Sequence, residues 1–221
     1  MFGVIIAAGY GTRFLPVTKT IPKEMLPIVD RPAIDFILDE FEEAGIKDVI
    51  IVTSRRKKAL EDYLDKEIEL EYFFQKESNA NKLSKIKPRE MNFVFIRQPE
   101  MLGTGHAILL IKNIVKNEPF IIAYPDDIFI GGNVSLQLIK HFKKHNSSIL
   151  PVLEMEGDVS SYGVVEVTCA GSGDGIMKVV KFVEKPPKGK EPSKLISVGR
   201  YLFTPDFLNE LEERYKPILK V

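Results

Sequence analysis

The chain has 221 residues, 44% of them hydrophobic, which suits one large domain with a substantial buried core. Its 31 Lys and Arg residues equal its 31 Asp and Glu residues, so the net charge argues against nucleic acid or an anionic membrane as a partner. Cys169 is the only cysteine, which excludes an intrachain disulfide and favours a cytoplasmic location. No apolar run reaches the ~18 residues that a membrane-spanning helix needs.

Apolar strands and amphipathic helices alternate through the first two thirds of the chain. Strands are predicted at Phe2–Ala8, Val49–Thr53, Asn92–Arg97, Pro119–Tyr124 and Ser148–Leu153. Helices are predicted from Asp30 to Gly45, over Lys57–Leu64, within "GTGHAILLIKNIV" and over Leu136–His145. This alternation predicts an α/β fold with a doubly wound, Rossmann-like, mixed but mostly parallel sheet and helices on both faces.

The first of these helices has clear end signals. Asp30 can act as its cap, Pro32 suits its first turn, and Gly45 can end it. Its apolar side chains share one face, at spacings of i, i+3, i+4 and i+7, and are Ile34, Ile37, Leu38 and Phe41. The helix within "GTGHAILLIKNIV" likewise has one apolar side, formed by Ala107, Ile108, Ile111 and Val115.

Two segments depart from the alternation. The stretch from Asp65 to Glu90 is long and charged, and its pattern indicates one or two helices or else a solvated excursion. After Ser160, "YGVVEV", "IMKVVKFVEKP" and "LISVGRYLFTP" predict short strands in a mixed, partly antiparallel section that is attached to the sheet and covers the site from one side. A last helix is predicted over Leu208–Tyr215.

The stretch "IIAAGYGTRFLPVTKTIPKEMLP" leaves the first strand through a glycine turn. Gly9 and Gly11 let the backbone come close to a bulky anion, whose oxygens can accept hydrogen bonds from the N–H groups. Two familiar phosphate motifs do not match: Phe14 stands where a dinucleotide fingerprint has its third glycine, and the Gly-Lys-Ser/Thr of a P-loop is absent.

Three cations follow this glycine turn, Arg13, Lys19 and Lys23. An arginine offers a bidentate fork and a lysine a point charge, and several cations beside backbone donors suit a polyphosphate. Pro16 prevents a helix from starting directly after the turn, so the loop is long. We interpret it as a polyphosphate-binding loop; the alternative is a solvated cationic loop.

Two further pairs of charged residues end predicted strands. Asp126 and Asp127, in "PDD", lie where a carboxylate often holds Mg²⁺ together with substrate phosphates, and the alternation of side chains predicts that only one of them reaches a metal. Glu184 and Lys185, in "VEKP", place an acceptor suited to a sugar diol beside a cation suited to a phosphate. The alternatives are a turn acid for the first pair and ordinary surface charge for the second.

Taken together, these motifs resemble those of a known family. The stretches "AAGYGTRFLPVTKTIPKEMLPIVDRP", "RQPEMLGTGHA", "YPDDIF", "SSYGVVEV", "VEKP" and "VGRYLFTPD" look like the bacterial UTP–glucose-1-phosphate uridylyltransferases in wording, order and spacing. The glycine–arginine loop is general to sugar nucleotidyltransferases, whereas "TKTIPKEMLPIVDRP" resembles the uridylyltransferase branch more narrowly. The resemblance covers nearly the whole chain, and it implies a glycosyltransferase-A-like nucleotidyltransferase fold.

The resemblance implies an activity, a cofactor and a set of site residues. The activity would be transfer of a uridylyl group from UTP to glucose 1-phosphate with Mg²⁺, in a single domain of residues 1–221 that has a nucleotide-binding part at 1–155 and a sugar-binding part at 156–221. The backbone of Ala7, Ala8, Gly9 and Gly11 would line the nucleotide, and Gln98 and Gly103 would read the uracil. Catalytic or ligand-binding roles would fall to Arg13 and Lys23 on the triphosphate, Asp126 on Mg²⁺, Gly163 and Glu184 on glucose, and Lys185 on its phosphate.

Family members of this kind continue beyond the position of Val221 with a segment resembling "GEIQLTDAI" and a strand that bears a second metal-binding Asp. We therefore expect a homo-oligomer, if one forms, to be weakened here. Three other functions remain open: a thymidylyltransferase, a nucleotide-sugar-binding protein without turnover, and a dinucleotide-dependent oxidoreductase, against which the missing third glycine counts. No role is assigned to His106 or Asp127.

Overall fold

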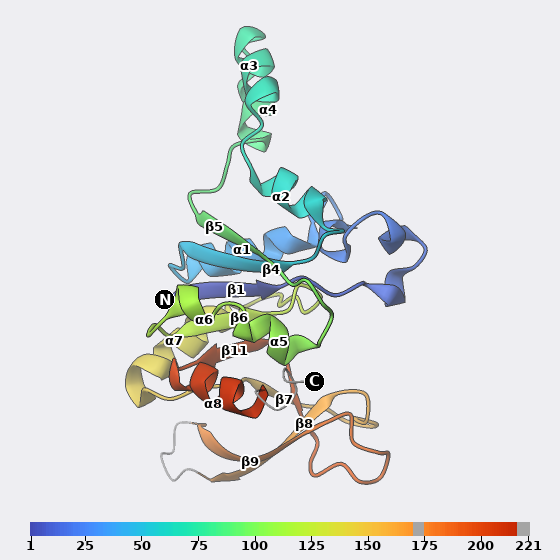
Figure 1. Ribbon diagram of the computed structural model, residues 1–221, viewed down its shortest axis with the longest axis vertical. Coiled ribbons are helices and arrows are strands. Elements are labelled where there is room, and N and C mark those ends of the chain that lie inside the picture. Colours follow the sequence, from blue (N-terminus) through green and yellow to red (C-terminus); the bar gives the residue numbers. More distant parts are fainter. Residues whose placement is uncertain (170–174, 216–221) are drawn as a thin grey trace.

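A computed structural model describes residues 1–169 and 175–215, and the side chain of Cys169 lies outside this description (Figure 1). Its main sheet has the strand order β11-β6-β1-β4-β5. The strands are β1 (Phe2–Ile6), β4 (Asp48–Thr53), β5 (Asn92–Arg97), β6 (Phe120–Ala123) and β11 (Arg200–Phe203). The first four are parallel, and β11 runs antiparallel to β6 at one edge. The predicted fold class is confirmed.

Helices cover both faces of this sheet. Successive strand residues point to opposite sides, and those of the central strands are apolar on both sides, so each face must be buried. On one face, Ile5 and Ile51 pack with α1 (Ala33–Glu43), α2 (Lys58–Leu64) and α7 (Val134–His145). On the other face, Val4 and Ile50 pack with α5 (Thr104–Leu109), α6 (Lys112–Val115) and α8 (Asp206–Tyr215). Each strand of the centre is therefore apolar on both sides.

The predicted apolar helix faces are buried as expected. Ile34, Ile37, Leu38 and Phe41 are fully buried in α1. The cap is different from the prediction, because Pro32 is the N-cap of α1 and Asp30 lies outside it. The single helix predicted within "GTGHAILLIKNIV" is two helices, α5 and α6, that meet at Leu110 and Ile111.

A second, smaller sheet lies below the first in Figure 1, with strand order β7-β10-β8-β9 and antiparallel pairing throughout. Its strands are β7 (Val152–Glu154), β8 (Gly163–Cys169), β9 (Met177–Glu184) and β10 (Leu195–Ser197). The prediction of a strand over Ser148–Leu153 was wrong in its bounds, since Ile149 makes only an isolated bridge to Leu202 before β7 begins. The chain returns to the main sheet at β11, and the division at 155 remains a prediction.

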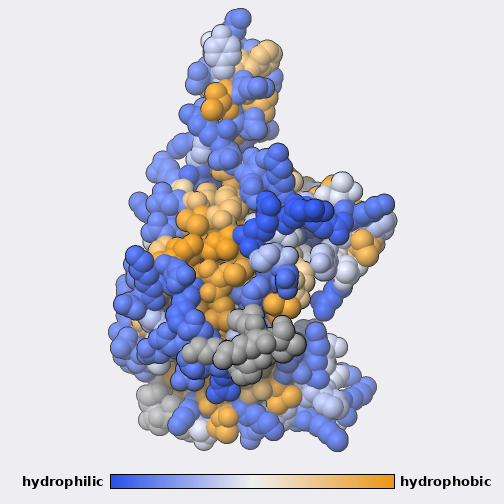
Figure 2. All heavy atoms as spheres, in the orientation of Figure 1, coloured by the Kyte–Doolittle hydropathy of each residue, from blue (hydrophilic) through white to orange (hydrophobic). Residues whose placement is uncertain are grey.

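The charged excursion forms two helices, α3 (Ile68–Lys76) and α4 (Ala80–Lys85), that project from the body as an arm (Figure 1). Phe73 and Phe74 meet edge to face, with ring centroids 6.1 Å apart, and the ammonium of Lys82 lies over the Phe74 ring. Hydrophobic side chains nonetheless remain at the surface of the arm among hydrophilic ones (Figure 2). Among the described helices, none has the length and apolarity to cross a membrane.

Candidate functional site

The site lies where the order of the parallel strands changes direction. From β1 the chain proceeds to β4 and β5 on one side, and it then returns to place β6 on the other side of β1. The loops that leave β1 and β6 therefore diverge, and ligands bind in the crevice at such a point in open α/β sheets. The two loops carry Lys23 and Asp126, whose Nζ and Oδ2 atoms are 2.9 Å apart.

The glycine loop starts from buried backbone. Ala7 and Ala8 are buried, and the N–H of Ala7 donates to the carbonyl of Val52 at 2.8 Å. Gly11 has φ of 67°, a left-handed conformation that favours glycine, and its carbonyl accepts a 2.7 Å bond from the Thr18 hydroxyl. Among the described residues, no atom lies within 4 Å of a Cβ built on Gly9, so the loop is open there.

A buried ion pair that the sequence did not reveal anchors the cationic loop. Glu24, next to Lys23 in a short 3-10 helix (Lys23–Met25), is fully buried, and its two oxygens accept bonds of 2.7 and 2.6 Å from Nζ of Lys57. Burial lowers the pKa of Lys57, while Glu24 opposes that change. A second tie comes from Arg56, which donates to the carbonyl of Lys19 at 3.0 Å. These contacts hold the loop against the turn before α2.

The two residues predicted to read the base touch each other. Nε2 of Gln98 lies 3.1 Å from the carbonyl oxygen of Gly103 and 3.1 Å from Nδ1 of His106. Gln98 is only 4% exposed, and its backbone N–H donates to Thr53. These contacts fix the amide at the end of β5, and they place His106 beside it as an orienting neighbour.

The predicted sugar residues line a cleft of about 730 Å³ between the two sheets. Arg13, Gly163, Glu184 and Lys185 all border it, although Arg13 comes from the opposite end of the chain. Gly163 pairs with Glu184 across β8 and β9. A Cβ built on Gly163 would lie 3.1 Å from Oε2 of Glu184, so a larger residue there would disturb the carboxylate.

Lys185 follows the last residue of β9 and has φ of 47°, and its Nζ is 3.6 Å from Oε1 of Glu184. Both side chains are exposed, so the pair itself contributes little to stability and is free to bind a ligand. The N–H of Lys185 donates to the carbonyl of Tyr162, which fixes the turn that presents it.

Sequence reasoning missed the aromatic wall of this cleft. Tyr124 and Tyr201 meet edge to face at 5.9 Å, and Tyr201 stacks on Phe203 at the same distance. Burial raises the pKa of both tyrosines, which keeps them neutral. The hydroxyl of Tyr201 lies 2.6 Å from that of Ser197. Alternate aromatic residues in "VGRYLFTPD" were a signal for such a wall.

A divalent cation fits Asp126 on chemical grounds. Its carboxylate is 41% exposed and already has the ammonium of Lys23 beside Oδ2. Within the described part of the chain, no group of three or more His, Cys, Asp or Glu side chains could hold a metal. A cation here would therefore take its other ligands from phosphate oxygens and water, as Mg²⁺ commonly does.

Comparisons with known proteins identify the family of this chain. The sequence profile of the nucleotidyl transferase family matches residues 2–220. UTP–glucose-1-phosphate uridylyltransferase of Bacillus subtilis is 44% identical over 216 residues, which are 96% of this chain and 73% of that protein.

Two solved structures are also similar. The UTP-bound UGPase from Acinetobacter baumannii has a TM-score of 0.86 and 34% identity, covering 96% of this chain and 76% of that one. A UDP-glucose pyrophosphorylase complexed with UDP-glucose has a TM-score of 0.82 and 40% identity, covering 96% and 79%. The chain thus belongs to the nucleotidyl transferase family, in the branch of the UTP–glucose-1-phosphate uridylyltransferases.

Proposed function

We propose that this chain transfers a uridylyl group from UTP to glucose 1-phosphate, giving UDP-glucose and pyrophosphate. The observation that carries this proposal is the convergence of Arg13, Gly163, Glu184 and Lys185 on one cleft. Beside that cleft, Lys23 meets Asp126 at the strand switch point. Relatives whose names state this reaction, and solved relatives described as bound to UTP and to UDP-glucose, support the same substrates.

The chemistry requires positioning more than proton transfer. A phosphate oxygen of glucose 1-phosphate attacks the α-phosphorus of UTP, and the bond from that phosphorus to the oxygen it shares with the β-phosphorus breaks, which releases pyrophosphate. The attacking monoester is mostly ionised at neutral pH, since its second pKa is about 6, so no general base is needed. The barrier lies in bringing two anions together and in the charge on the leaving group.

The residues divide these tasks between the two sides of the cleft. The nucleotide lies along the backbone of Ala7, Ala8, Gly9 and Gly11. The uracil is bound by the side chain of Gln98 and the backbone of Gly103, which are hydrogen-bonded to each other. Lys23 and Arg13 bind the triphosphate and then the leaving pyrophosphate. Fixed cations of this kind stabilise charge without reorganising during the reaction.

The sugar substrate occupies the side formed by the second sheet. Glu184 accepts hydrogen bonds from glucose hydroxyls, and Gly163 leaves room for the ring against the strand. Lys185 neutralises the phosphate of glucose 1-phosphate and so lowers the repulsion between the two substrates. Asp126 would hold Mg²⁺, which when bound neutralises phosphate charge. The cytoplasmic location and any homo-oligomer remain predictions.

The test is pyrophosphate release by the 221-residue chain with UTP, glucose 1-phosphate and Mg²⁺. In parallel, dTTP replaces UTP, and glucose replaces glucose 1-phosphate. Release that needs the sugar phosphate and is faster with UTP supports the proposal. Faster release with dTTP would make the chain a thymidylyltransferase, and binding of UDP-glucose without any release would make it a binding protein.

A further inference from the structure

A buried charged network lies beneath the loop that carries Asp126. Arg200, at the start of β11, is 0% exposed, and Glu40 of α1 is 7% exposed. Nε of Arg200 donates to both carboxylate oxygens of Glu40 at 3.1 Å, and Nη2 donates to Oε2 at 2.8 Å. The N–H and the hydroxyl of Ser135 in α7 also donate to Glu40. Charge-assisted bonds in this number fix the orientation of the guanidinium group.

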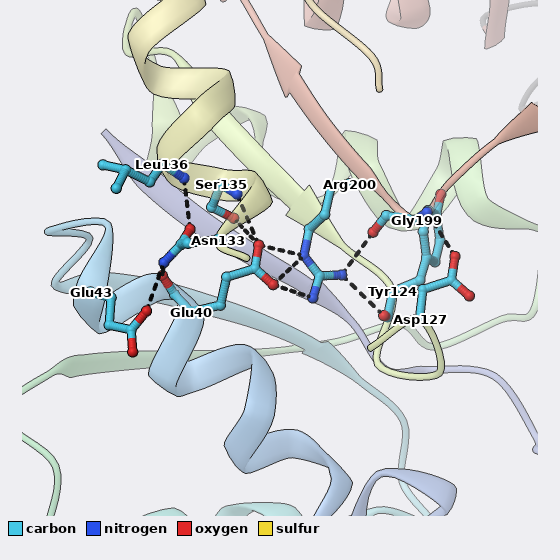
Figure 3. Close-up of polar contacts among 9 residues, drawn as sticks. All are labelled: Glu40, Glu43, Tyr124, Asp127, Asn133, Ser135, Leu136, Gly199 and Arg200. Atoms are coloured by element: carbon cyan, nitrogen blue, oxygen red, sulfur yellow. Dashed lines mark hydrogen bonds and ion pairs between the residues drawn. The ribbon is translucent and has the colours of Figure 1, made fainter. Parts of the chain in front are cut away.

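The remaining nitrogen of Arg200 points away from Glu40 and toward the end of β6 (Figure 3). Nη1 donates to the carbonyl oxygen of Gly199 at 2.9 Å and to that of Tyr124 at 3.4 Å. The carbonyl of Tyr124 also accepts the N–H of Asp127 at 3.1 Å, which closes a four-residue turn. Asp126 is the third residue of this turn.

Asp127 holds the same turn from its other end. Its Oδ2 accepts the N–H of Gly199 at 2.7 Å (Figure 3). A Cβ built on Gly199 would lie 2.8 Å from both Cβ and Cγ of Asp127, so position 199 has no room for a side chain while this contact exists. Two side chains therefore join the turn to the start of β11, which lies next to β6 in the sheet. Arg200 is the buried one and Asp127 the exposed one.

We propose that Arg200 and Asp127 are positioning residues, which hold the Tyr124–Asp127 turn so that Asp126 faces Lys23. Arg200 is fully buried, and Asp127, which borders the cleft, serves as an acceptor for Gly199 and not as a second metal ligand. The inference rests on the proposed function, because the position of Asp126 matters only if it binds a cation with the nucleotide. Loss of a group that orients a metal ligand typically costs about 10–100-fold in metal affinity or activity.

The first test is Arg200→Lys, compared with Arg89→Lys. Lysine keeps a positive charge opposite Glu40 but lacks the fork that also reaches Tyr124 and Gly199. We expect the Mg²⁺ concentration for half-maximal UDP-glucose synthesis to rise about 10–100-fold. Mn²⁺ binding to the enzyme–UTP complex, followed by electron paramagnetic resonance, should weaken by the same factor, while KM for glucose 1-phosphate stays constant.

Arg89→Lys is the matched control. Arg89 forms ion pairs with Asp35, Asp39 and Glu42 at the base of the arm. The same substitution there should affect stability without changing the Mg²⁺ dependence. If Arg200→Lys changes the Mg²⁺ and Mn²⁺ titrations no more than Arg89→Lys does, the positioning role of Arg200 is overturned.

A second pair of variants, at Asp127, tests the positioning role if Arg200→Lys does not fold. Asp127→Asn keeps an oxygen acceptor for the N–H of Gly199, whereas Asp127→Ala removes it. We expect the alanine variant to weaken Mn²⁺ binding and the asparagine variant to restore most of it. Equal loss in both would show that the charge of Asp127 acts on the metal and would overturn the proposal. A wild-type chain that binds Mn²⁺ with UTP but makes no UDP-glucose would count against the proposed function alone.

Discussion

The ammonium of Lys23 lies 2.9 Å from the carboxylate of Asp126, so two residues that the proposed reaction needs for different ligands neutralise each other. Lys23 is 16% exposed and Asp126 is 41% exposed, which leaves the pair open to the crevice on the Asp126 side. A nucleotide that arrives with a divalent cation supplies both partners at once: phosphate oxygens for the lysine and a metal for the carboxylate. The pair thus maintains charge balance before the ligand binds.

Lys23→Gln should separate these two interactions. Without the lysine, UTP loses a charge-assisted hydrogen bond worth about 1.5–3 kcal/mol, and its affinity should fall about 10–100-fold. Without nucleotide, Mn²⁺ should bind more tightly, because no ammonium competes at Asp126. Both affinities can be measured by titration calorimetry. Lys143→Gln, an exposed lysine on α7, is the control, and equal losses of UTP affinity in the two variants would contradict the assignment.

Glu24→Gln should lower the free energy of unfolding of the chain. The substitution leaves the ammonium of Lys57 buried without its charge partner, which typically costs about 3–5 kcal/mol. Adding Lys57→Met should recover much of this loss, since both charges are then absent. Urea unfolding followed by circular dichroism measures both changes.

The exposed pair of Lys82 and Glu77 is the control for this prediction, and Lys82→Met should cost less than about 1 kcal/mol. A loss in Glu24→Gln no larger than in this control would mean that the buried pair does not anchor the cationic loop.

Gly163→Ala should impair the sugar substrate selectively. The added methyl group would lie 2.6 Å from the Phe182 ring and 3.1 Å from Oε2 of Glu184, so one of the two must move. Because misplacement by about 1 Å can cost up to about 100-fold in rate, we expect kcat/KM for glucose 1-phosphate to fall toward that limit while KM for UTP is retained.

Steady-state kinetics at fixed UTP measures this effect, and Phe182→Leu in the same chain should relieve part of it. Gly132→Ala is the matched control, since a Cβ there lies 3.9 Å from Gln137 and, apart from its chain neighbours, within 4 Å of no other described residue. Unchanged glucose 1-phosphate kinetics in Gly163→Ala would remove Gly163 from the sugar site.

Tyr215→Phe should weaken the binding of the nucleotide base. The hydroxyl of Tyr215 on α8 donates to the carbonyl of Leu102 at 3.1 Å, and its ring lies against Gly105, so α8 supports the segment that carries Gly103. Loss of one such bond is worth about 0.5–1.5 kcal/mol, and we expect KM for UTP to rise about 2- to 10-fold with kcat unchanged.

The measurement compares kcat/KM for UTP with kcat/KM for dTTP in the Tyr215→Phe variant. If the segment that carries Gly103 is displaced, the ratio of the two values should also fall. Tyr72→Phe on the exposed arm should change neither value. An effect on glucose 1-phosphate and not on UTP would separate Tyr215 from the nucleotide side.

The amino-acid sequence by itself determined the local structure and the chemical character of this protein. Periodicity placed the strand Asn92–Arg97 at its observed bounds and put Ile34, Ile37, Leu38 and Phe41 on the buried face of α1. These predictions succeeded because hydrophobic spacing and turn residues act over a few positions. The motifs also indicated the family, since "GYGTRF", "YPDDIF" and "VEKP" can each be found in the chain without knowing the fold.

Only the tertiary structure decided how those motifs support one another. The pairs Glu24–Lys57 and Glu40–Arg200 join residues far apart in the chain, and each charge taken alone looks like ordinary surface polarity. Asp127 and Asp126 are likewise distinguished by their partners, because Gly199 lies beside Asp127 and Lys23 lies beside Asp126. The physical reason is that burial and partner choice are properties of the packed chain: a carboxylate becomes an anchor or a ligand site according to what the sheet order brings beside it.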